Sequence, residues 1–572
     1  MSNEAVAALL QEYADLLAIT GSEAFKSRVY EKAARAVAGH AAAVARLDRA
    51  ELRKIPGVGA SIADKIVELR DTGRVAAVDE LRRKIPAGVR AMTTVPGLGP
   101  KKAMALYDRL GIDSVAALEE AIDAGALSGL PGFGPKTAAN LRHGIELSRA
   151  QTGRFLIDAA MATATEIVSA LQAIGGCQRC AYAGSLRRMR DTIGDIDILA
   201  ASDHPQPLME ALVALPLVTE VIVRGDKKTS VRTRTGIQVD LRVVPLASWG
   251  AALLYLTGSR AHTLRLREIA QRAGLKLSEY GLFRTDDDAV VVSKTEEEVY
   301  ERLGLAYIPP TLREDRGEIE AAADGTLPHL VTVEDIKGDL HTHTSLTDGV
   351  STLDQMVSVA RERGLRWYAV TDHAEKLPMQ RMTRAKALKQ REQVLAMSSR
   401  GMSLLHGTEL NIDPEGGVDW DADFLAGFDV CVASVHSHFT QSAPQMTRRL
   451  IAACENPYVH IIGHPSTRQI GRRPPIEADW DAVFAAAGRT GTAMEINSYP
   501  DRLDLSGELV LRAKQHGVKF AVNTDSHSTV HLGFLRFGVG QAQRGWLTPD
   551  DVITAWPLTR LRSFLRAKSR LA

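Results

Sequence analysis

The stretch AGSLRRMRDTIGDIDILA, residues 183–200, decides the fold expected for the first half of the chain. Its second part is strand-like, and Asp195 and Asp197 are spaced i, i+2, so both carboxylates leave the same face of a strand. Asp240, in the strand-like run IQVDLRVV, offers a third oxygen donor from a neighbouring strand. Because adjacent carboxylates repel, the cluster predicts a bound divalent cation, and hard oxygen ligands suit Mg²⁺. We expect a two-metal site for phosphoryl transfer.

A short turn precedes this strand. Gly184, Ser185, Arg187 and Arg188 combine small residues with donors suited to phosphate oxygens. A DxD pair alone is common on surface strands and by itself favours an ordinary solvated face. The turn before the pair and the VDLR strand after it favour the metal site instead.

Three glycine turns mark the N-terminal part: IPGVG at 55–59, VPGLG at 95–99 and LPGFG at 130–134. A helix-like stretch precedes and follows each turn, so the repeat resembles the helix-hairpin-helix motif. Two glycines around an apolar residue permit a turn whose backbone N–H groups face a phosphate. A single copy fits a glycine-capped connector equally well, but three copies favour contact with a DNA backbone. The residues expected to contact DNA are Gly57, Gly59, Gly97, Gly99, Lys101, Lys102, Gly132, Gly134 and Lys136.

The length and composition of the chain indicate several domains. At 572 residues it is too long for one hydrophobic core. Hydrophobic residues make up 45% and charged residues 24%, as in soluble globular proteins, and no apolar run is long enough to span a bilayer. The sequence starts without a secretory signal, and four cysteines make no disulfide framework, so we expect a cytoplasmic protein without membrane contact. We interpret the lone CxxC at Cys177 and Cys180 as incidental.

Beyond residue 335, apolar strand-like runs end in polar residues, as in DLHTHTSLTDG, YAVTDHAE, LHGTELNI, VCVASVHSHF, VHIIGHP, TAMEINS and FAVNTDSHS. Their anchors lie 27 to 36 residues apart, about one strand plus one helix per step, which predicts a β/α barrel. In such barrels the side chains at the C-terminal strand ends converge on one mouth. The anchors are His341, His373, Glu409, His436, His464, Glu495 and Asp525.

Two pairs in this half, His341 with His343 and Asp525 with His527, have the spacing that puts both side chains on one face. Mixed imidazole and carboxylate clusters suit Zn²⁺, Mn²⁺ or Fe²⁺. A single histidine is more often a surface or hydrogen-bonded residue than a ligand. Six histidines at strand ends favour a metal centre.

The GSxxR turn, the DxD strand and the VDLR strand together resemble the nucleotidyltransferase palm of family X DNA polymerases. The resemblance extends through YLTGSRAHTLRLR (255–267), LSEYGLF (277–283) and YIPPTLRE (307–314), which are similar to the thumb of that family. With the hairpins it covers nearly all of residues 1–320. It implies that Asp195, Asp197 and Asp240 bind two Mg²⁺ or Mn²⁺ ions.

The same resemblance implies a nucleotide site. Ser185 and Arg188 would bind the triphosphate of the incoming nucleotide, and Tyr255 and Gly258 would line its sugar pocket. Leu256 stands where the family has a phenylalanine, and Thr263 where it has an asparagine that contacts the incoming base, so sugar discrimination and fidelity are left open. The expected nucleotide-binding residues are Gly184, Ser185, Arg188, Gly194, Tyr255, Gly258 and Thr263.

The N-terminal stretch FKSRVYEKAA (25–34), with IPGVGASIADK after it, resembles the small lyase domain of the β-type enzymes. Lys65 matches the lysine that forms a Schiff base in that family. Such a nucleophile needs a pKa lowered by neighbouring cations or by desolvation. Lys26 matches one neighbour, but Ser61 stands where another lysine is usual, so a phosphate contact by Lys65 remains the alternative.

The pattern HxHxxxxD, followed by DH, E, H, H and DxH, resembles the PHP domain over residues 335–572. The resemblance implies up to three ions of Mn²⁺, Zn²⁺ or Fe²⁺. Glu495 and Asn497 match a common string of the family without an assigned role, and His438 and His460 are expected to be structural. The implied metal ligands are His341, His343, Asp348, His373, Glu409, His436, His464, Asp525 and His527.

Joined in this order, the two halves imply a multidomain α+β and α/β chain. The expected parts are a lyase-like helical DNA-binding region (1–85), a fingers-like helix-hairpin-helix region (86–152), a palm (153–245), a thumb (246–318), a linker (319–334) and a distorted (β/α)7 PHP barrel (335–572). The implied function is gap-filling DNA synthesis in base excision repair, with a 3′-5′ exonuclease and abasic-site activity in the PHP domain. Gapped or primed DNA and deoxynucleoside triphosphates would be the partners of a monomer.

Two alternatives concern the C-terminal half. One makes the PHP domain a small-molecule phosphatase resembling histidinol phosphatase, and fusion to a DNA-binding half disfavours it. The other makes the domain a catalytically silent scaffold, which the complete ligand set disfavours.

Overall fold

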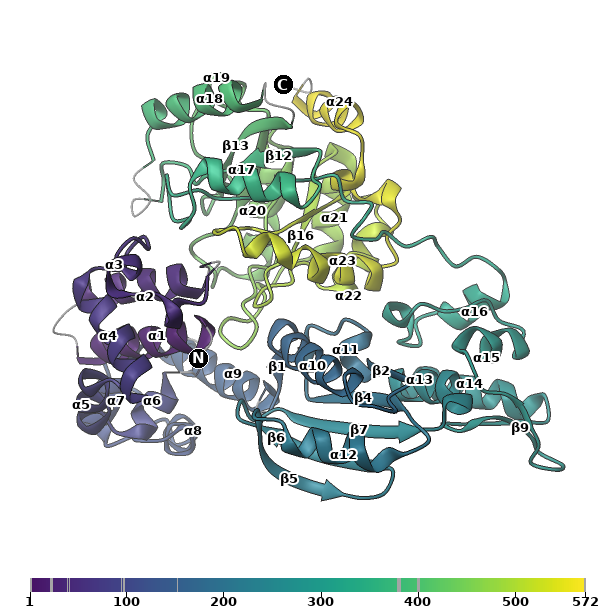
Figure 1. The fold of residues 1–572 in the computed structure, drawn as a ribbon. Coiled ribbons are helices and arrows are strands. Elements are labelled where there is room, and N and C mark those ends of the chain that lie inside the picture. The colour runs from purple at the N-terminus through teal and green to yellow at the C-terminus, as the bar shows by residue number, and fades with distance from the viewer. Residues whose placement is uncertain are drawn as a thin grey trace.

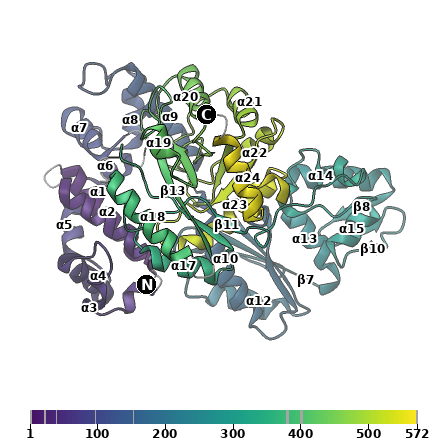
Figure 2. The ribbon, with the colours of Figure 1, turned by 90° about the horizontal axis from the view of Figure 1, so that it is seen from above.

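The computed structural model describes residues 3–20, 24–38, 40, 42–93, 95, 98–151, 153–377, 382–398 and 402–569. An N-terminal helical part is followed by a mixed sheet, a smaller α+β unit and a C-terminal barrel, which lies above the sheet in Figure 1. Seen from above, the N-terminal helices and the α+β unit lie on opposite sides of the molecule (Figure 2). Among the described helices, none combines the length and the apolar character that a membrane span requires.

The N-terminal helices pack around one apolar core that extends from Val6 to Ile145. The apolar residue at the centre of each glycine turn is buried in this core, as Val58, Leu98 and Phe133 show. Each turn is therefore anchored in the core through this residue, while the described glycines beside it are exposed. The helices are α1 Asn3–Thr20, α2 Ala24–Ala38, η1 Val44–Arg46, α3 Arg49–Leu52, α4 Ala60–Thr72, α5 Ala76–Lys84, α6 Ala87–Met92, α7 Pro100–Leu110, α8 Val115–Asp123 and α9 Pro135–Gln151.

Five described strands form a mixed sheet within residues 153–245, the region expected to be the palm and called so below, in the order β2-β4-β7-β6-β5. The parallel pair β4 and β7 places Asp197 opposite Asp240, while Ile196 and Ile198 point to the other face and are fully buried. The alternation along β4 thus separates the carboxylates from the core. The elements are β1 Phe155–Leu156, α10 Ile157–Gln172, β2 Arg179–Tyr182, α11 Gly184–Arg187, β3 Thr192–Ile193, β4 Asp195–Ala201, α12 Pro205–Ala214, β5 Val218–Arg224, β6 Lys228–Thr233 and β7 Gln238–Val244.

The thumb combines helices with the antiparallel strands β8, β9 and β10. Residues 319–334, expected to be a linker, differ from that expectation because Ile319, Ala322 and Leu330 are buried in the thumb core. The small and acidic residues of this stretch are typical of linkers, but positions 319 and 322 share one helical face. The elements are η2 Leu246–Ser248, α13 Trp249–Thr257, α14 Arg260–Arg272, β8 Leu275–Ser278, β9 Gly281–Arg284, β10 Val290–Val292, α15 Glu296–Arg302, η3 Pro310–Leu312 and α16 Glu318–Ala323.

The C-terminal half confirms the predicted barrel. In its described part, seven parallel strands follow one another in chain order from β11 to β17, and a bridge between Thr342 and Ser526 joins the two ends of the sheet. The strands are β11 Gly338–Asp339, β12 Trp367–Val370, β13 Ser403–Asn411, β14 Val430–Ser434, β15 Ile461–Ile462, β16 Ala493–Asn497 and β17 Phe520–Asn523. The helices are α17 Leu353–Glu362, α18 Arg384–Ser398, α19 Ala422–Leu425, α20 Ala443–Glu455, α21 Trp480–Thr490, α22 Gly507–Lys514, η4 His531–Phe534, α23 Leu535–Arg544, η5 Pro549–Asp551, η6 Ile553–Ala555 and α24 Leu558–Ser569.

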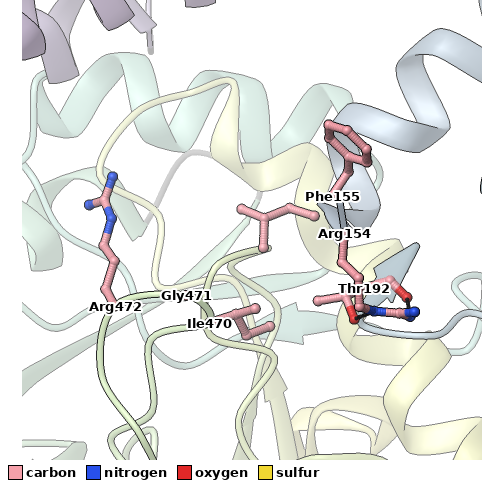
Figure 3. Close-up of a pocket in the computed structure, with 7 residues that line it drawn as sticks. Arg154, Phe155, Thr192, Ile470, Gly471 and Arg472 are labelled. Atoms are coloured by element: carbon pink, nitrogen blue, oxygen red, sulfur yellow. Dashed lines mark hydrogen bonds between the residues drawn. The ribbon is translucent and has the colours of Figure 1, made fainter. Parts of the chain in front are cut away.

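A loop of the barrel reaches down to the palm. Arg468 Nη1 lies 3.0 Å from Asp191 Oδ2, just before β3. Beside this ion pair, Arg154, Phe155 and Thr192 of the palm and residues 470–472 of the loop line a cavity of about 240 Å³ (Figure 3). The barrel and the palm are therefore in direct contact rather than tethered by a linker alone.

Candidate active sites in the palm and the barrel

The palm carboxylates converge as their spacing predicts. One oxygen from each of Asp195, Asp197 and Asp240 lies within 4.8 Å of the others. Burial, and then the charges of Asp195 and Asp240, raise the pKa of Asp197 to about 7. A carboxyl group with that pKa is only partly ionised at neutral pH, and a divalent cation would restore its charged form. The donor set thus fits hard divalent cations.

Lys228 is a residue of this site that the sequence analysis missed. From β6, its Nζ lies 2.7 Å from Asp240 Oδ2, while Gln238 Nε2 donates to Asp240 Oδ1 at 3.0 Å. Burial alone would raise the pKa of Asp240, but these contacts outweigh burial and lower it. The pairing of β6 with β7 places Lys228 there, and no spacing within one strand could have indicated it.

The turn before the strand is shaped around Asp197. Gly184 has φ of +61°, and a Cβ at this position would lie 2.1 Å from Asp197 Oδ2. Glycine is therefore required both by the backbone conformation and by the space. The turn continues into α11, a single helical turn that begins at Gly184.

A cavity of about 520 Å³ joins this turn to the thumb. Of the predicted nucleotide-binding residues, Gly184, Ser185, Arg188, Tyr255, Gly258 and Thr263 line the cavity beside Asp195 and Asp197, with Leu256. Gly194 lies outside this lining, next to the first carboxylate in the chain.

Two arginines of α14 also line the cavity and were missed by the sequence analysis. Arg260, Thr263, Leu264 and Arg267 all contribute, and their spacing of i, i+3, i+4 and i+7 defines one helical face. From that spacing, the sequence could have indicated that both arginines lie on the same helical face as Thr263. The face adds two cations to the cavity that Asp195 and Asp197 also line, and cations suit the binding of a polyanion.

The glycine turns lead directly into helices α4, α7 and α9. Gly57 and Gly132 both have φ of +84°, and Gly59 and Gly99 are exposed N-caps of α4 and α7 without a side-chain cap. Exposed helix starts without a side-chain cap leave backbone N–H groups available, which suits phosphate binding.

The cations beside these turns are only partly described. Lys101 is exposed, whereas Lys102 Nζ lies 5.6 Å from the ring of Phe133 in the third turn. Gly134 precedes α9 and is exposed. The predicted contact Gly97 lies outside the described residues, and Lys136 is described in its backbone only.

Lys65 lies on α4, beside the first glycine turn. Its Nζ donates to Ser61 Oγ at 3.1 Å and lies 5.4 and 5.6 Å from the ring centroids of Tyr13 and Tyr30. These are contacts that suit a cation. Ser61 occupies the place where the resemblance expects a second lysine, and it acts as a hydrogen-bond acceptor there.

All nine predicted ligands of the barrel meet at the C-terminal ends of its strands. Three overlapping groups hold their ligand atoms within 4.8 Å of one another, and His464 Nε2 lies 3.1 Å from Glu409 Oε1. Glu409 and His343 are fully enclosed, and Asp348 is partly exposed at the mouth. The groups are His343, Asp348, His373 and His527; His341, His343 and Asp525; and His373, Glu409 and His436.

The chemistry of this donor set fits up to three divalent cations. His341 Nε2, His343 Nε2 and Asp348 Oδ1 are buried without a hydrogen-bond partner among the described residues, and a metal ion would satisfy them. Burial favours the neutral form of Glu409, but the surrounding imidazoles outweigh it and hold its pKa well below the ordinary value. The cluster is therefore arranged to present an ionised carboxylate.

Glu495 and Asn497, which the sequence left without a role, lie behind the ligands. Glu495 Oε1 accepts a hydrogen bond from His341 Nδ1 at 2.7 Å, and Asn497 Nδ2 donates to Asp525 Oδ2 at 3.0 Å. Such partners fix the tautomer and the orientation of a ligating group. Their i, i+2 spacing on β16, pointing at the barrel interior, was the signal that could have assigned this role.

Arg502 is a further residue that the sequence analysis missed. Its Nε lies 3.7 Å from Asp525 Oδ2, and its Nη1 is buried without a hydrogen-bond partner among the described residues. Burial, and then this guanidinium, lower the pKa of His464 to about 4, which keeps that imidazole in the neutral form a ligand needs. A guanidinium with an unused donor beside a metal cluster suits a phosphate oxygen.

Four family models match the chain. They are described as a DNA polymerase beta thumb (residues 252–314), a helix-hairpin-helix domain (1–75), a SAM-like helix-hairpin-helix tandem (89–146) and a PHP domain (339–499).

Curated relatives match the whole chain or one half of it. The DNA polymerase/3′-5′ exonuclease PolX of Bacillus subtilis (strain 168) is 34% identical over 571 residues, or 99% of this chain and 100% of that protein. DNA polymerase lambda of Rattus norvegicus is 27% identical over 299 residues, 46% of this chain and 48% of that protein. A probable phosphatase of Thermoanaerobacter sp. (strain X514) is 30% identical over 244 residues, 41% of this chain and 95% of that protein.

Proposed function

The chain belongs to the PolX family of DNA polymerase/3′-5′ exonucleases, family X polymerases with a C-terminal PHP domain, and we propose that it fills short DNA gaps and trims DNA 3′ ends at two separate sites. The observation that carries this proposal is the pair of metal-ligand clusters, one made of carboxylates and one rich in imidazole. Primer extension and primer degradation on gapped DNA, beside metal analysis of the purified chain, test it directly. Absence of both activities with metal bound would overturn it.

In the palm, we assign the two-cation site to Asp195, Asp197 and Asp240. Bound Mg²⁺ or Mn²⁺ would supply charge stabilisation for nucleotidyl transfer. Asp240, held by Lys228, orients the primer 3′-hydroxyl, while Ser185 and Arg188 bind the triphosphate. We assign Gly194, next to Asp195 in the chain, to the same nucleotide site. Tyr255, Gly258 and Thr263 contact its sugar and base.

In the barrel, the nine ligands would hold up to three ions of Mn²⁺, Zn²⁺ or Fe²⁺, which would supply an activated water for phosphodiester hydrolysis. Glu495 orients His341, and Asn497 orients Asp525. Arg502, which lies beside Asp525 and is not fully buried, binds a non-bridging oxygen of the scissile phosphodiester through its guanidinium.

The glycine turns contact DNA phosphates in this proposal, through Gly57, Gly59, Gly97, Gly99, Gly132 and Gly134 with Lys101, Lys102 and Lys136. Such contacts position DNA without reading its sequence. We further propose that the protein acts in base excision repair in the cytoplasm, as a monomer, with abasic-site cleavage as a second activity of the barrel.

A phosphatase activity of the barrel is the second candidate, because relatives named probable phosphatases match 244 residues of this chain, a stretch about as long as the barrel half. Activity on p-nitrophenyl phosphate compared with activity on DNA 3′ ends distinguishes the two. Strong hydrolysis of the small ester together with inactivity on DNA would favour the phosphatase.

Arg502→Ala should lower kcat/KM for primer degradation by about 10- to 100-fold, because a charge-assisted hydrogen bond to phosphate contributes about 1.5–3 kcal/mol. Metal content should stay at the parental value, since Arg502 is not a ligand. The matched control is Arg489→Ala, which removes an exposed arginine paired with Glu455 at 2.9 Å. Parental degradation by Arg502→Ala would refute the phosphate contact.

Lys65 is proposed as a Schiff-base nucleophile or, alternatively, as a phosphate contact. Borohydride should trap a small amount of covalent adduct with DNA carrying a 5′-deoxyribose phosphate, and Lys65→Ala should remove it. A weak signal is expected because Ser61, not a cation, lies beside Lys65. Lack of an adduct in the parent protein leaves Lys65 as a phosphate contact.

A further inference from the structure

The barrel helix α23 lies against the phosphate-binding turn of the palm, although the two are separated by some 350 residues (Figure 1). Arg544 Nη1 donates to Arg188 O, and Gln541 Nε2 donates to Met189 O, each at 3.0 Å. Both donors are nearly fully buried. The carbonyl groups that follow α11 are thus satisfied by another domain, in the way that side chains cap a helix end.

The backbone at Met189 needs outside support. Met189 has φ of +56°, a left-handed conformation that costs energy for a residue with a side chain and persists only where its surroundings hold it. Its side chain packs onto Gly540 of α23, where a Cβ would lie 2.7 Å from Met189 Cε and 2.9 Å from Met189 Cβ. The close fit between the helix and the turn therefore holds this conformation.

A shared carboxylate continues the contact to the nucleotide cavity. Glu314 Oε1 accepts from Arg544 Nη1 at 2.8 Å and from Arg188 Nε at 3.2 Å. Arg188 also donates to Thr257 O and lines the cavity. The orientation of the Arg188 side chain thus depends on Glu314, whose other buried partner is Arg544. At the far end of the same turn, Asp191 pairs with Arg468 of the barrel at 3.0 Å.

We propose that the PHP barrel holds the triphosphate-binding turn of the palm in its receptive shape, with Arg544 and Gln541 as positioning residues for the incoming nucleotide. The inference rests on the proposed function, in which Ser185 and Arg188 bind the triphosphate. The barrel then serves nucleotide binding at the palm in addition to its own hydrolytic site.

The test compares full-length Arg544→Ala with Arg536→Ala, a matched control that removes an exposed arginine from the same helix. Loss of a hydrogen bond to a charged donor corresponds to a change of about tenfold, so KM for the deoxynucleoside triphosphate should rise by about tenfold in Arg544→Ala. Primer degradation and the KM of Arg536→Ala should stay at parental values. An unchanged nucleotide KM in Arg544→Ala overturns the proposal.

Two further variants keep the test informative. Gln541→Met, which removes one donor, should raise the nucleotide KM by about threefold if Arg544→Ala fails to fold. An unchanged KM in Gln541→Met overturns the proposal in that case. Arg188→Ala combined with Arg544→Ala should raise the KM by less than the product of the two single effects, because Arg544 acts in part through the Arg188 side chain, whereas two independent losses would multiply. If Arg188→Ala itself leaves the nucleotide KM unchanged, the triphosphate site fails; if only Arg544→Ala does, the positioning role fails.

Discussion

Asp197→Asn should abolish nucleotide incorporation on gapped DNA, with kcat lowered by about 10³-fold or more, because a lost metal ligand removes several kcal/mol of charge stabilisation. Asparagine keeps the shape of the side chain that faces Gly184, so the turn should remain intact. Single-turnover incorporation with Mg²⁺ measures the loss. Primer degradation in Mn²⁺ should continue at the parental rate, since the barrel ligands lie on other elements.

The matched control is Asp203→Asn, which changes an exposed carboxylate of the palm that accepts from Gln178. It should extend primers as the parent does. Normal extension by Asp197→Asn would end the assignment of the palm as the polymerase site. Equal binding of gapped DNA by parent and variant would show that the fold and the DNA contacts survive.

His341→Ala should stop primer degradation in Mn²⁺ and lower the metal content of the purified protein, while nucleotide incorporation continues. His341 is fully buried, its Nδ1 is fixed by Glu495, and its Nε2 faces the cluster of His343 and Asp525. Loss of one ligand and of its oriented partner should reduce activity by about 100-fold or more. Metal analysis gives a readout that does not depend on turnover.

The control for this change is His516→Ala, which removes a histidine that pairs with Asp481 at 3.1 Å on the helical surface of the barrel. It should degrade primers and bind metal as the parent does. If Asp197→Asn and His341→Ala each lost both activities while folded, the two sites would be one catalytic unit. The contact between α23 and the palm predicts a weaker link between the two sites: changes in α23 should alter the KM for the nucleotide but leave primer degradation unchanged.

The sequence by itself determined which side chains share a face of one strand, and it determined the repeat of the βα units. Asp195 and Asp197 lie on one face because side chains on a strand alternate, and Asp240 is in register with Asp197 on the neighbouring strand. The histidine rhythm predicted the barrel because each βα unit returns the chain to the same mouth. The resemblance implied the full ligand set; eight of its residues form the clusters, and His464 joins them through Glu409.

Only the tertiary structure decided which groups support these sites from outside. Lys228, Arg502 and Arg544 act through contacts made when a strand pairs, a barrel closes or two domains dock. The raised pKa of Asp197 likewise follows from burial beneath the turn. The spacing of residues in the sequence predicts which face of its own helix or strand a side chain occupies. Its partner across an interface depends on how two surfaces pack together, and local spacing does not predict that packing.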